Sequence, residues 1–542
     1  MIKKSGVWLT LALFLALNAY DAFSRFGWQD VDLPRTQFFF FSLWVALRNI
    51  ICYSLFTTSL VFFLGKFSRW IIVPLFTLCL VIEGAAVYAY RAFNADLGEL
   101  WLDLIENTNW AEIVGFVSMA ANWQYICTLI GVTIIIGTAS WMIWTAEFPK
   151  ISLKSFRNGV VCVVPFLLLN CILMNWHFGV AQTRYSYFVV RTAVSYKRMA
   201  GVRQACKNGG IPTNIEKTSS KAPDVIIVIG ESATRNNWHL YGYNRDTTPL
   251  LDKLNDEGKL IVFKDVLGAH PDTVGALSQL LTDVTFDHRA NGNWTLAGLY
   301  AHAGFRTVLI SQQYWLSDTN STLYKIFNGC EKRISVSHEF GGKAFDEATI
   351  PLLEKELAST DGRPNMIFVH LAGMHYPVQN VIPEKEKFFT DTIGPEALEG
   401  LDARQKDRRN RYDDAIRYED KVLGGLIDVL AKRPKATAFF FVSDHGESPR
   451  SEGWRNFKDI DVYSVPVVCW FSEAYHKQFP ATVNAFMRAV DKPIQQDEMT
   501  YGLLELGQIK CAYVDDDKLN FLREGFKGRS PRYYDKGRET LR

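Results

Sequence analysis

Two short motifs, far apart in the sequence, carry side chains that can bind a metal ion. Gly230-Glu231-Ser232 follows the β-type run 224–229, and Ser443-Asp444-His445-Gly446-Glu447 follows the β-type run 438–442. If both runs are buried parallel strands, the motifs leave the sheet at one edge, where open α/β sheets place their active sites. Glu, Asp and His offer oxygen and nitrogen donors that suit Zn²⁺. Each motif alone could be a helix-capping acid or a loop Asp-His pair, but together they predict a metal site.

Thr273 is the candidate nucleophile. It lies in the segment Gly268-Ala-His-Pro-Asp-Thr273-Val-Gly, after a predicted strand at 260–264. At a helix N-terminus, unbonded N–H groups and the positive end of the helix dipole would face an anion. A Thr hydroxyl attacks poorly unless a metal or a base lowers its pKa. Thr273 could also be the N-cap of that helix, and the two roles are compatible.

Two histidines stand at the end of another predicted strand, 365–371. His370 lies within the strand, so we interpret it as a core residue. His375 follows the strand end, where it could protonate a leaving group or bind a second metal. The alternative for His375 is an ordinary loop histidine.

The elements that must position these residues alternate between strand and helix from Pro223 onward. This alternation predicts an α/β domain with a mostly parallel sheet, sandwiched by helices on both faces. The predicted strands are 225–229, 260–264, 307–311, 365–371, 438–442 and 465–471. The predicted helices are 249–256, 274–281, 296–303, 344–358 and 413–432.

The part of the chain before Trp176 holds nearly all of the long apolar runs, and five of them approach the roughly 20 residues that cross a bilayer. They are Val7–Phe23, Leu43–Leu64, Trp70–Tyr90, Trp123–Trp144 and Gly159–Phe178. Basic residues cluster before the first run, between the second and third, and between the fourth and fifth. The positive-inside rule then places the N-terminus in the cytoplasm and the C-terminal domain outside. Glu83, inside the third run, is either a functional acid or one paired within the bundle.

This pattern predicts three regions. Residues 1–180 form a five-helix transmembrane domain that includes an amphipathic helix near 97–117 on the outer membrane face. Residues 181–222 form a bridging helix and a Gly/Pro/Ser/Lys-rich linker. Residues 223–542 form the outer, catalytic domain. In the amphipathic helix, Glu106, Asn107 and Thr108 would face lipid headgroups or substrate, unless this is simply a solvated helical turn.

The composition of the chain limits its possible partners and its domain number. The formal net charge of +2 argues against a nucleic-acid partner chosen by bulk charge. The chain is too long for one domain. An oxidising compartment would permit a disulfide such as Cys206–Cys330, although spacing alone cannot assign one.

Taken in order, the motifs resemble those of the bacterial inner-membrane phosphoethanolamine transferases, a family of the alkaline phosphatase/sulfatase superfamily. The resemblance covers essentially the whole chain, including the five apolar runs. The matching segments are Val228-Ile-Gly-Glu-Ser232, Leu240–Pro249, Thr273, His370-Leu-Ala-Gly-Met-His375, Tyr412–Asp420 and Ser443-Asp-His-Gly-Glu447.

The resemblance implies a two-step covalent transfer. Zn²⁺ held by Glu231, Thr273, Asp444 and His445 would activate the Thr273 hydroxyl to attack phosphatidylethanolamine. The phosphoethanolamine would then pass from Thr273 to an envelope acceptor: lipopolysaccharide core, lipid A or periplasmic glucan. His375 would bind the phosphoryl group, protonate the leaving oxygen or hold a second zinc. The enzyme would sit in the inner membrane with its catalytic domain in the periplasm.

Two departures from the family pattern matter. Family members often carry a second His ten to thirty residues after the Asp-His pair, and residues 446–472 contain none. We therefore expect one zinc site and doubt a complete second one. The same loop offers Arg455 and Asn456 to bind phosphate or acceptor. The chain also lacks a cysteine near Thr273, which favours the core-heptose or glucan branch over the lipid A branch.

Other functions remain open on the same residues. A phosphoglycerol transferase would use the same Thr and metal with another donor. A sulfatase would need Cys or Ser at the nucleophile position, which Thr273 does not provide. A catalytically dead, membrane-anchored binding protein is disfavoured because the whole set of candidate ligands is intact.

Overall fold

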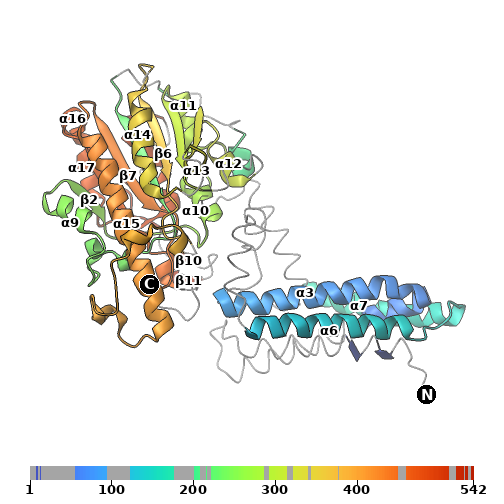
Figure 1. The fold of residues 1–542 in the computed structure, drawn as a ribbon. Coiled ribbons are helices and arrows are strands. Elements are labelled where there is room, and N and C mark those ends of the chain that lie inside the picture. The colour runs from blue at the N-terminus through green and yellow to red at the C-terminus, as the bar shows by residue number, and fades with distance from the viewer. Residues whose placement is uncertain are drawn as a thin grey trace. The chain divides into compact units, whose positions relative to one another are not determined.

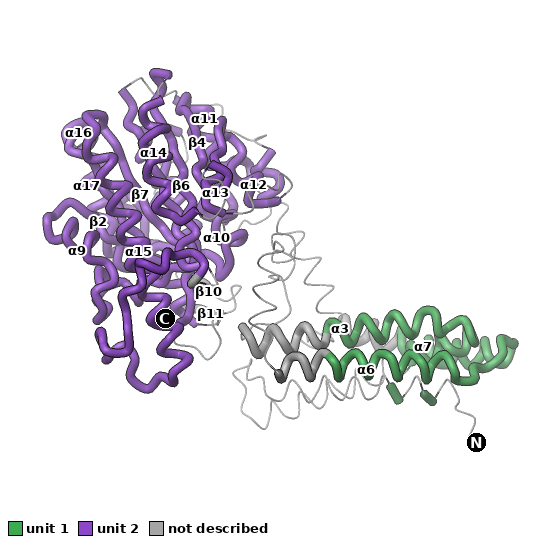
Figure 2. The backbone as a smooth tube through the Cα atoms, viewed as in Figure 1, with its two compact units in different colours: residues 1–91, 96–101, 111–193 green, residues 92–95, 102–110, 194–542 purple. Residues whose placement is uncertain are grey.

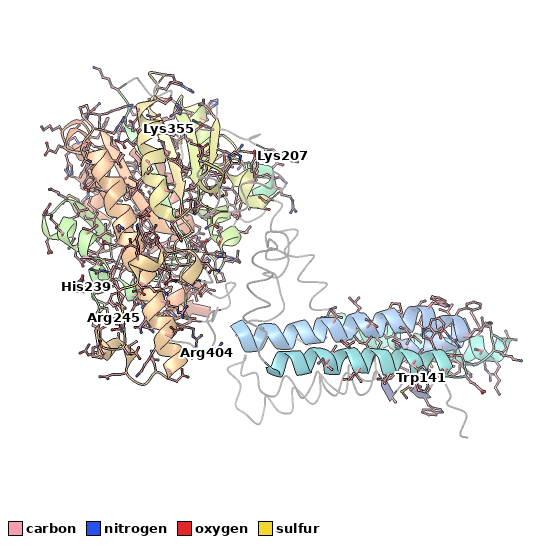
Figure 3. The ribbon with its side chains drawn as sticks, viewed as in Figure 1. Trp141, Lys207, His239, Arg245, Lys355 and Arg404 are labelled. Atoms are coloured by element: carbon pink, nitrogen blue, oxygen red, sulfur yellow. The ribbon has the colours of Figure 1, made fainter. Side chains whose placement is uncertain are left out.

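The computed structural model describes residues 8–9, 12–13, 55–93, 123–175, 201–207, 215–216, 221–285, 292–313, 321–339, 344–359, 361–375, 378–449, 459–511, 520–529, 532–534 and 539–541. The chain divides into two compact units, coloured separately in Figure 2. Unit 1 comprises Met1–Arg91, Asp96–Trp101 and Ala111–Ala193, and unit 2 comprises Ala92–Ala95, Leu102–Trp110 and Val194–Arg542.

Unit 1 is helical where it is described. Its long helices are α3 (Arg69–Phe93), α6 (Trp123–Thr145) and α7 (Leu153–Asn175), and residues 55–64 form a further helical segment. These helices cover the third and fourth predicted apolar runs and the fifth as far as Asn175, but α7 begins at Leu153 instead of Gly159. It starts earlier because the preceding Lys- and Arg-containing turn is itself helical, which an apolar window does not detect.

In the described part of the chain, one helical stretch, Leu55–Ile82, is both long enough and apolar enough to cross a membrane. Ile130–Thr145 is a shorter apolar helix. Most of the first predicted span and the predicted amphipathic helix at 97–117 lie outside the described residues. The five-helix bundle therefore stays a prediction.

Two basic segments of unit 1 meet at one end of its helices. The 3₁₀ turn η1 (Gly65–Ser68) precedes α3, and Arg69 donates from its guanidinium to the Trp144 carbonyl over 3.2 Å. The Ser155 hydroxyl donates to the Phe62 carbonyl. These contacts bring Lys66 and Arg69 to the same end as the basic segment around Lys154, in line with the charge pattern used to orient the chain.

Unit 2 is built on a sheet of seven described strands in the order β2-β8-β7-β1-β6-β4-β5 (Figure 1). The strands are β1 (Asp224–Gly230), β2 (Leu260–Phe263), β4 (Arg306–Ser311), β5 (Lys332–Ser335), β6 (Asn365–His370), β7 (Thr437–Ser443) and β8 (Val467–Phe471). β8 pairs antiparallel with both neighbours, and the other pairings are parallel. The predicted mostly parallel sheet is confirmed.

The central strands β1 and β7 run side by side in register. Asp224 pairs with Thr437 and Gly230 pairs with Ser443, so both strands end at the same level. Both are fully buried and rich in Val, Ile and Phe, as strands covered on both faces are. The residues that follow them, Glu231 and Asp444, therefore leave the sheet next to each other.

Helices cover both faces of the sheet because its side chains alternate between two apolar cores. Val225, Ile227 and Ile229 point into one core, and Ile226 and Val228 into the other. The first core includes α10 (Thr273–Leu280), α11 (Leu296–His302), α12 (Thr322–Ile326), α16 (Glu473–Gln478), α17 (Pro480–Arg488) and α18 (Thr500–Leu506). The second includes α9 (Pro249–Asp256), α13 (Val336–Glu339), α14 (Thr349–Ala358) and α15 (Ala403–Ala431); α14 and α15 lie across the sheet in Figure 1.

The largest correction concerns α15, which begins at Ala403 and not at the predicted residue 413. A capping box starts it: Asp402 accepts from the Gln405 N–H, and the Gln405 side chain accepts from the Asp402 N–H. Its first turns are mostly charged, so an apolar periodicity does not reveal them. β5, α16, α17 and α18 were also missed, as were the short pairs β3 (Val266–Leu267) with β9 (Ile494–Gln495) and β10 (Arg532–Tyr534) with β11 (Glu539–Leu541).

Candidate active site

Glu231, Asp444 and His445 form a buried cluster at the C-terminal ends of β1 and β7. One possible ligand atom from each residue lies within 4.8 Å of the others. Among the described residues, this is the group of His, Cys, Asp or Glu side chains close enough together to hold a metal ion. His445 Nε2 lies 3.4 Å from Glu231 Oε1 and 3.5 Å from Asp444 Oδ2. All three side chains are at most 1% exposed. The strand register alone brings the two predicted motifs together.

The backbone around the cluster is held in a strained form. Ser232 has a φ of 60°, in the left-handed region that residues other than glycine seldom adopt. Its N–H donates to Asp444 Oδ1 over 3.0 Å. The Tyr412 hydroxyl donates to the Ser232 carbonyl over 2.7 Å and accepts from the Thr234 N–H over 2.9 Å. Tyr412 of α15 therefore fixes the turn that directs Glu231.

The cluster holds two buried carboxylates, Glu231 and Asp444, whose pKa values shift in opposite directions. Burial opposes ionisation of Glu231, but the hydrogen bond and charge of His445 hold the pKa of Glu231 well below its usual range. Burial, and then repulsion from Glu231, raises the pKa of Asp444 to about 7. The positive charge of a metal ion would favour the ionised form of both carboxylates, because it offsets the cost of burying them and their mutual repulsion.

Two details fit a zinc ion. Asp444 Oδ2 is buried and has no hydrogen-bond partner in the described structure, which is unfavourable unless a ligand is bound. His445 Nδ1 lies 2.9 Å from the Gly446 carbonyl, so Nδ1 donates to that carbonyl, and Nε2, which faces the carboxylates, is the nitrogen that would bind a metal after losing its proton. Two carboxylates and a neutral imidazole are a donor set typical of zinc.

Thr273 joins this cluster from a different part of the fold. It is the first residue of α10, and its hydroxyl donates to Glu231 Oε2 over 3.0 Å. The N-cap of α10 is Asp272, whose Oδ1 accepts from the Gly275 N–H over 2.9 Å. Thr273 is therefore not the cap, and its hydroxyl is left to face the candidate ligands.

Sequence reasoning missed a buried pair beside Thr273. His270 Nδ1 lies 2.7 Å from Asp272 Oδ2, and both side chains are buried. Burial favours the neutral acid, but the charge and hydrogen bond of His270 lower the pKa of Asp272 to about 2. A Cβ on Gly275 would lie 2.2 Å from His270 Nδ1, so the ring packs directly on the helix backbone. A His three residues and an Asp one residue before the Thr were the available signal.

His375 lies next to the cluster through the loop after β6. The Met374 N–H donates to the Glu231 carbonyl over 2.9 Å, and Gly373, with a φ of 50°, packs its backbone on Glu231. His375 is close enough for its charge to lower the pKa of Glu231. His370 is fully buried, as its interpretation as a core residue requires, and burial lowers its pKa to about 4.

Several predicted residues are not brought to the cluster by the described structure. Glu106, Asn107, Thr108, Arg455 and Asn456 lie outside the described residues, and their roles stay predictions. The disulfide that the sequence allowed is not formed: Cys206 and Cys330 are separate thiols buried in the same core.

A mostly parallel sheet with Glu, Asp and His at one edge, and a Thr at a helix N-terminus facing them, fits the alkaline phosphatase/sulfatase class of α/β domain that the motifs resemble. The chain belongs to the sulfatase family, whose family model matches residues 223–509. The resemblance drawn from the motifs is thereby confirmed.

Similar proteins that carry the name phosphoethanolamine transferase include EptC and CptA. EptC of Escherichia coli is 30% identical over 316 residues, which is 54% of this chain and 53% of that protein, so the match spans about half of its length. CptA of Salmonella typhimurium is 26% identical over 88% of this chain and 89% of that protein.

Similar solved structures include the EptC periplasmic domain and full-length EptA. The periplasmic domain of E. coli EptC in complex with Zn has a TM-score of 0.53 and 25% identity, and covers 58% of this chain and 91% of that domain. The integral membrane EptA of Neisseria meningitidis has a TM-score of 0.69 and 19% identity, and covers 94% of this chain and 98% of that protein. At this identity the EptA likeness shows the fold alone.

Proposed function

We propose that this protein transfers phosphoethanolamine from phosphatidylethanolamine to a cell-envelope acceptor through a covalent adduct on Thr273. The observation that carries the proposal is the 3.0 Å hydrogen bond from the Thr273 hydroxyl to Glu231 inside the ligand cluster. The names of the relatives support the reaction, and the zinc in the EptC domain supports the metal.

Glu231, Thr273, Asp444 and His445 would hold one Zn²⁺. The ion would supply positive charge that lowers the pKa of the Thr273 hydroxyl and offsets the charge of the phosphoryl group. The unpartnered Asp444 Oδ2 and the orientation of His445 Nε2 support this assignment. His375 is a candidate for a second metal, but the lack of a further His in residues 446–472 argues against a complete second site.

In the first step Thr273 Oγ1 attacks the phosphorus of the donor. The Thr273 proton passes to Glu231, the base in hydrogen-bond contact with the hydroxyl. The bond from phosphorus to the diacylglycerol oxygen breaks. His375, whose charge acts on Glu231, would protonate that leaving oxygen. N–H groups at the start of α10 face the phosphoryl oxygens and stabilise their charge.

In the second step a hydroxyl or phosphate oxygen of the acceptor attacks the same phosphorus. The bond from phosphorus to Thr273 Oγ1 breaks as Thr273 regains its proton, and a hydroxyl acceptor gives its own proton to His375, which the first step left deprotonated. We propose a lipopolysaccharide core sugar, lipid A or a periplasmic glucan as acceptor, with Glu106, Asn107, Thr108, Arg455 and Asn456 in substrate binding. No step requires a nucleic acid or an organic cofactor.

The proposed setting is the bacterial inner membrane, with a cytoplasmic N-terminus and a periplasmic catalytic domain. Residues 1–180 would be the membrane domain, 181–222 the connection and 223–542 the catalytic domain. The shared position of the basic segments at one end of unit 1 supports this orientation. The full-length likeness to EptA supports the fold of both parts.

The test is the intact mass of the zinc-loaded, full-length protein after incubation with phosphatidylethanolamine. We expect a gain of one phosphoethanolamine in the native protein and no gain in Thr273→Ala. An adduct with phosphatidylglycerol in place of phosphatidylethanolamine would instead identify a phosphoglycerol transferase. Neither adduct, together with no bound zinc, would favour a binding protein.

A further inference from the structure

We propose that Gln496 is a positioning residue that holds the nucleophile segment against the metal-ligand segment. Gln496 follows β9 and opens the 3₁₀ turn η10 (Gln496–Glu498). Its side chain is fully buried, although it is polar. The proposal rests on the proposed function, because it assigns a role in loading Thr273.

The oxygen and the nitrogen of the Gln496 side-chain amide both bind backbone groups. The two backbone groups belong to different segments of the site. Its Oε1 accepts from the Ala269 N–H over 3.1 Å, in the segment that leads to Thr273. Its Nε2 donates to the Ser443 carbonyl over 2.8 Å, in the residue just before Asp444. One amide thus bridges the two segments whose separation determines how Thr273 meets the ligands.

The bridge matters because the nucleophile segment does not belong to the main sheet. Glu231 and Asp444 follow β1 and β7, which are fixed to each other by register. The segment before Thr273 instead leaves β3, which pairs with β9 in a separate two-stranded sheet. Side-chain and loop contacts hold this segment instead. The Arg235 guanidinium, in the loop after β1, donates to the Val266 carbonyl over 2.7 Å, and the Gln496 amide reaches the end of β7.

Gln496 is itself held rigidly, as a positioning residue must be. The next residue, Asp497, forms a two-pronged ion pair with Arg529, with N–O distances of 3.0 and 2.9 Å. Arg529 also donates to Gln495 Oε1 over 2.9 Å, and the Gln495 N–H donates to Glu498 Oε2 over 2.8 Å. The backbone on both sides of Gln496 is therefore fixed, and its amide is oriented before substrate arrives.

Loss of the Gln496 bridge should affect zinc binding and the loading of Thr273 differently. Zinc should still bind, because Glu231, Asp444 and His445 are placed by β1 and β7. Loading of Thr273 should slow, because a displacement of about 1 Å of a reacting group can lower a rate about 100-fold. A purely structural role would instead lower the amount of folded protein and leave the rate per folded molecule unchanged.

The experiment compares zinc-loaded, full-length native protein with Gln496→Met and Gln496→Glu. Bound zinc, melting temperature and the rate of phosphoethanolamine adduct formation at saturating phosphatidylethanolamine are measured on the same samples. We expect zinc to be retained and the loading rate to fall about 10- to 100-fold in Gln496→Met, which keeps the length and loses both hydrogen bonds. Gln496→Glu keeps the acceptor for Ala269 but turns a buried carboxyl oxygen against the Ser443 carbonyl, so we expect a loss at least as large.

Asn365→Leu is the matched control. Asn365 is a buried amide at the first residue of β6, at the opposite end of the sheet, where it donates to Asp224 Oδ1 over 3.1 Å. This variant should lower the melting temperature and keep the native loading rate per folded molecule. If Gln496→Met does not accumulate in folded form, Gln496→Glu carries the test.

Each outcome decides between the two proposals. Native loading rates in folded Gln496 variants would overturn the positioning role while leaving the proposed function intact. Loss of zinc in Gln496→Met would also overturn it, because the residue would then support the ligands and not Thr273. No adduct in the native protein would overturn the proposed function itself.

Discussion

The Thr273 hydroxyl donates to Oε2 of Glu231 over 3.0 Å, although the two residues are 42 positions apart and lie on different elements. Glu231 follows a central strand, and Thr273 begins a helix that packs against one face of the sheet. The contact places the candidate nucleophile on a candidate metal ligand.

Replacing Glu231 by Gln should remove zinc without unfolding the protein. The amide keeps an acceptor for Thr273 but loses the charge that a zinc ligand needs. We expect zinc affinity to fall at least about tenfold, measured by metal analysis after dialysis against a weak chelator. Glu257→Gln, at a surface acid paired with Lys259, is the control and should bind zinc like the native protein. Equal zinc binding by both variants would remove Glu231 from the ligand set.

Gly275→Ala should be harmful, although Ala ordinarily stabilises a helix by about 1 kcal/mol relative to Gly. The new Cβ would lie 2.2 Å from His270 Nδ1, so the ring must move away from Asp272. We expect a lower melting temperature and slower loading of Thr273. Adding His270→Ala to Gly275→Ala should recover stability because the clash is gone. A single variant as stable as the native protein would contradict this packing.

Tyr412→Phe should weaken the turn that carries Glu231. The variant loses the hydrogen bonds to the Ser232 carbonyl and the Thr234 N–H, at a cost of about 1–3 kcal/mol in the free energy of unfolding. Because Ser232 is strained, its relaxation should also lower zinc affinity. Tyr418→Phe, on the same helix, loses a hydrogen bond to the Glu347 N–H and should reduce stability alone. Comparable zinc affinity in both variants would argue against a role for Tyr412 at the site.

The stability of the protein should depend on pH through Asp346. Burial raises the pKa of Asp346 from 3.8 to about 6, although its carboxylate accepts from the N–H groups of Ala372 and Gly373. The folded state therefore binds this proton more tightly than the unfolded state does. The resulting stabilisation is complete below the unfolded pKa and is lost as pH rises through about 6.

Asp346→Asn measures this contribution, because the amide does not titrate. The variant should be less stable than the native protein at about pH 4.5, and the difference should shrink towards about pH 7 by about 2 kcal/mol. Urea unfolding of zinc-free protein at both pH values gives the two differences. A difference that is constant with pH would show that Asp346 does not titrate in this range.

Much of the fold could be predicted because burial and local pattern agree. The continuous apolar runs before Glu231 and Asp444 are strands buried on both faces, and their positions follow from the sequence alone. The charged start of α15 and the short strand β5 could not be predicted, because neither carries an apolar period. The earlier start of α7 and the separate two-stranded sheet of β3 and β9 could not be predicted either.

The sequence by itself determined which residues can do chemistry, because residue type and position after a buried strand are local properties. It selected Glu231, Thr273, Asp444 and His445, and it placed His375 nearby. Only the tertiary structure decided how they meet. The register of β1 and β7 sets two ligands side by side, and Tyr412 and Gln496 fix the connecting backbone from distant segments. Hydrogen bonds between residues hundreds of positions apart leave no periodic signal in one sequence, because their partners are chosen by packing and not by local propensity.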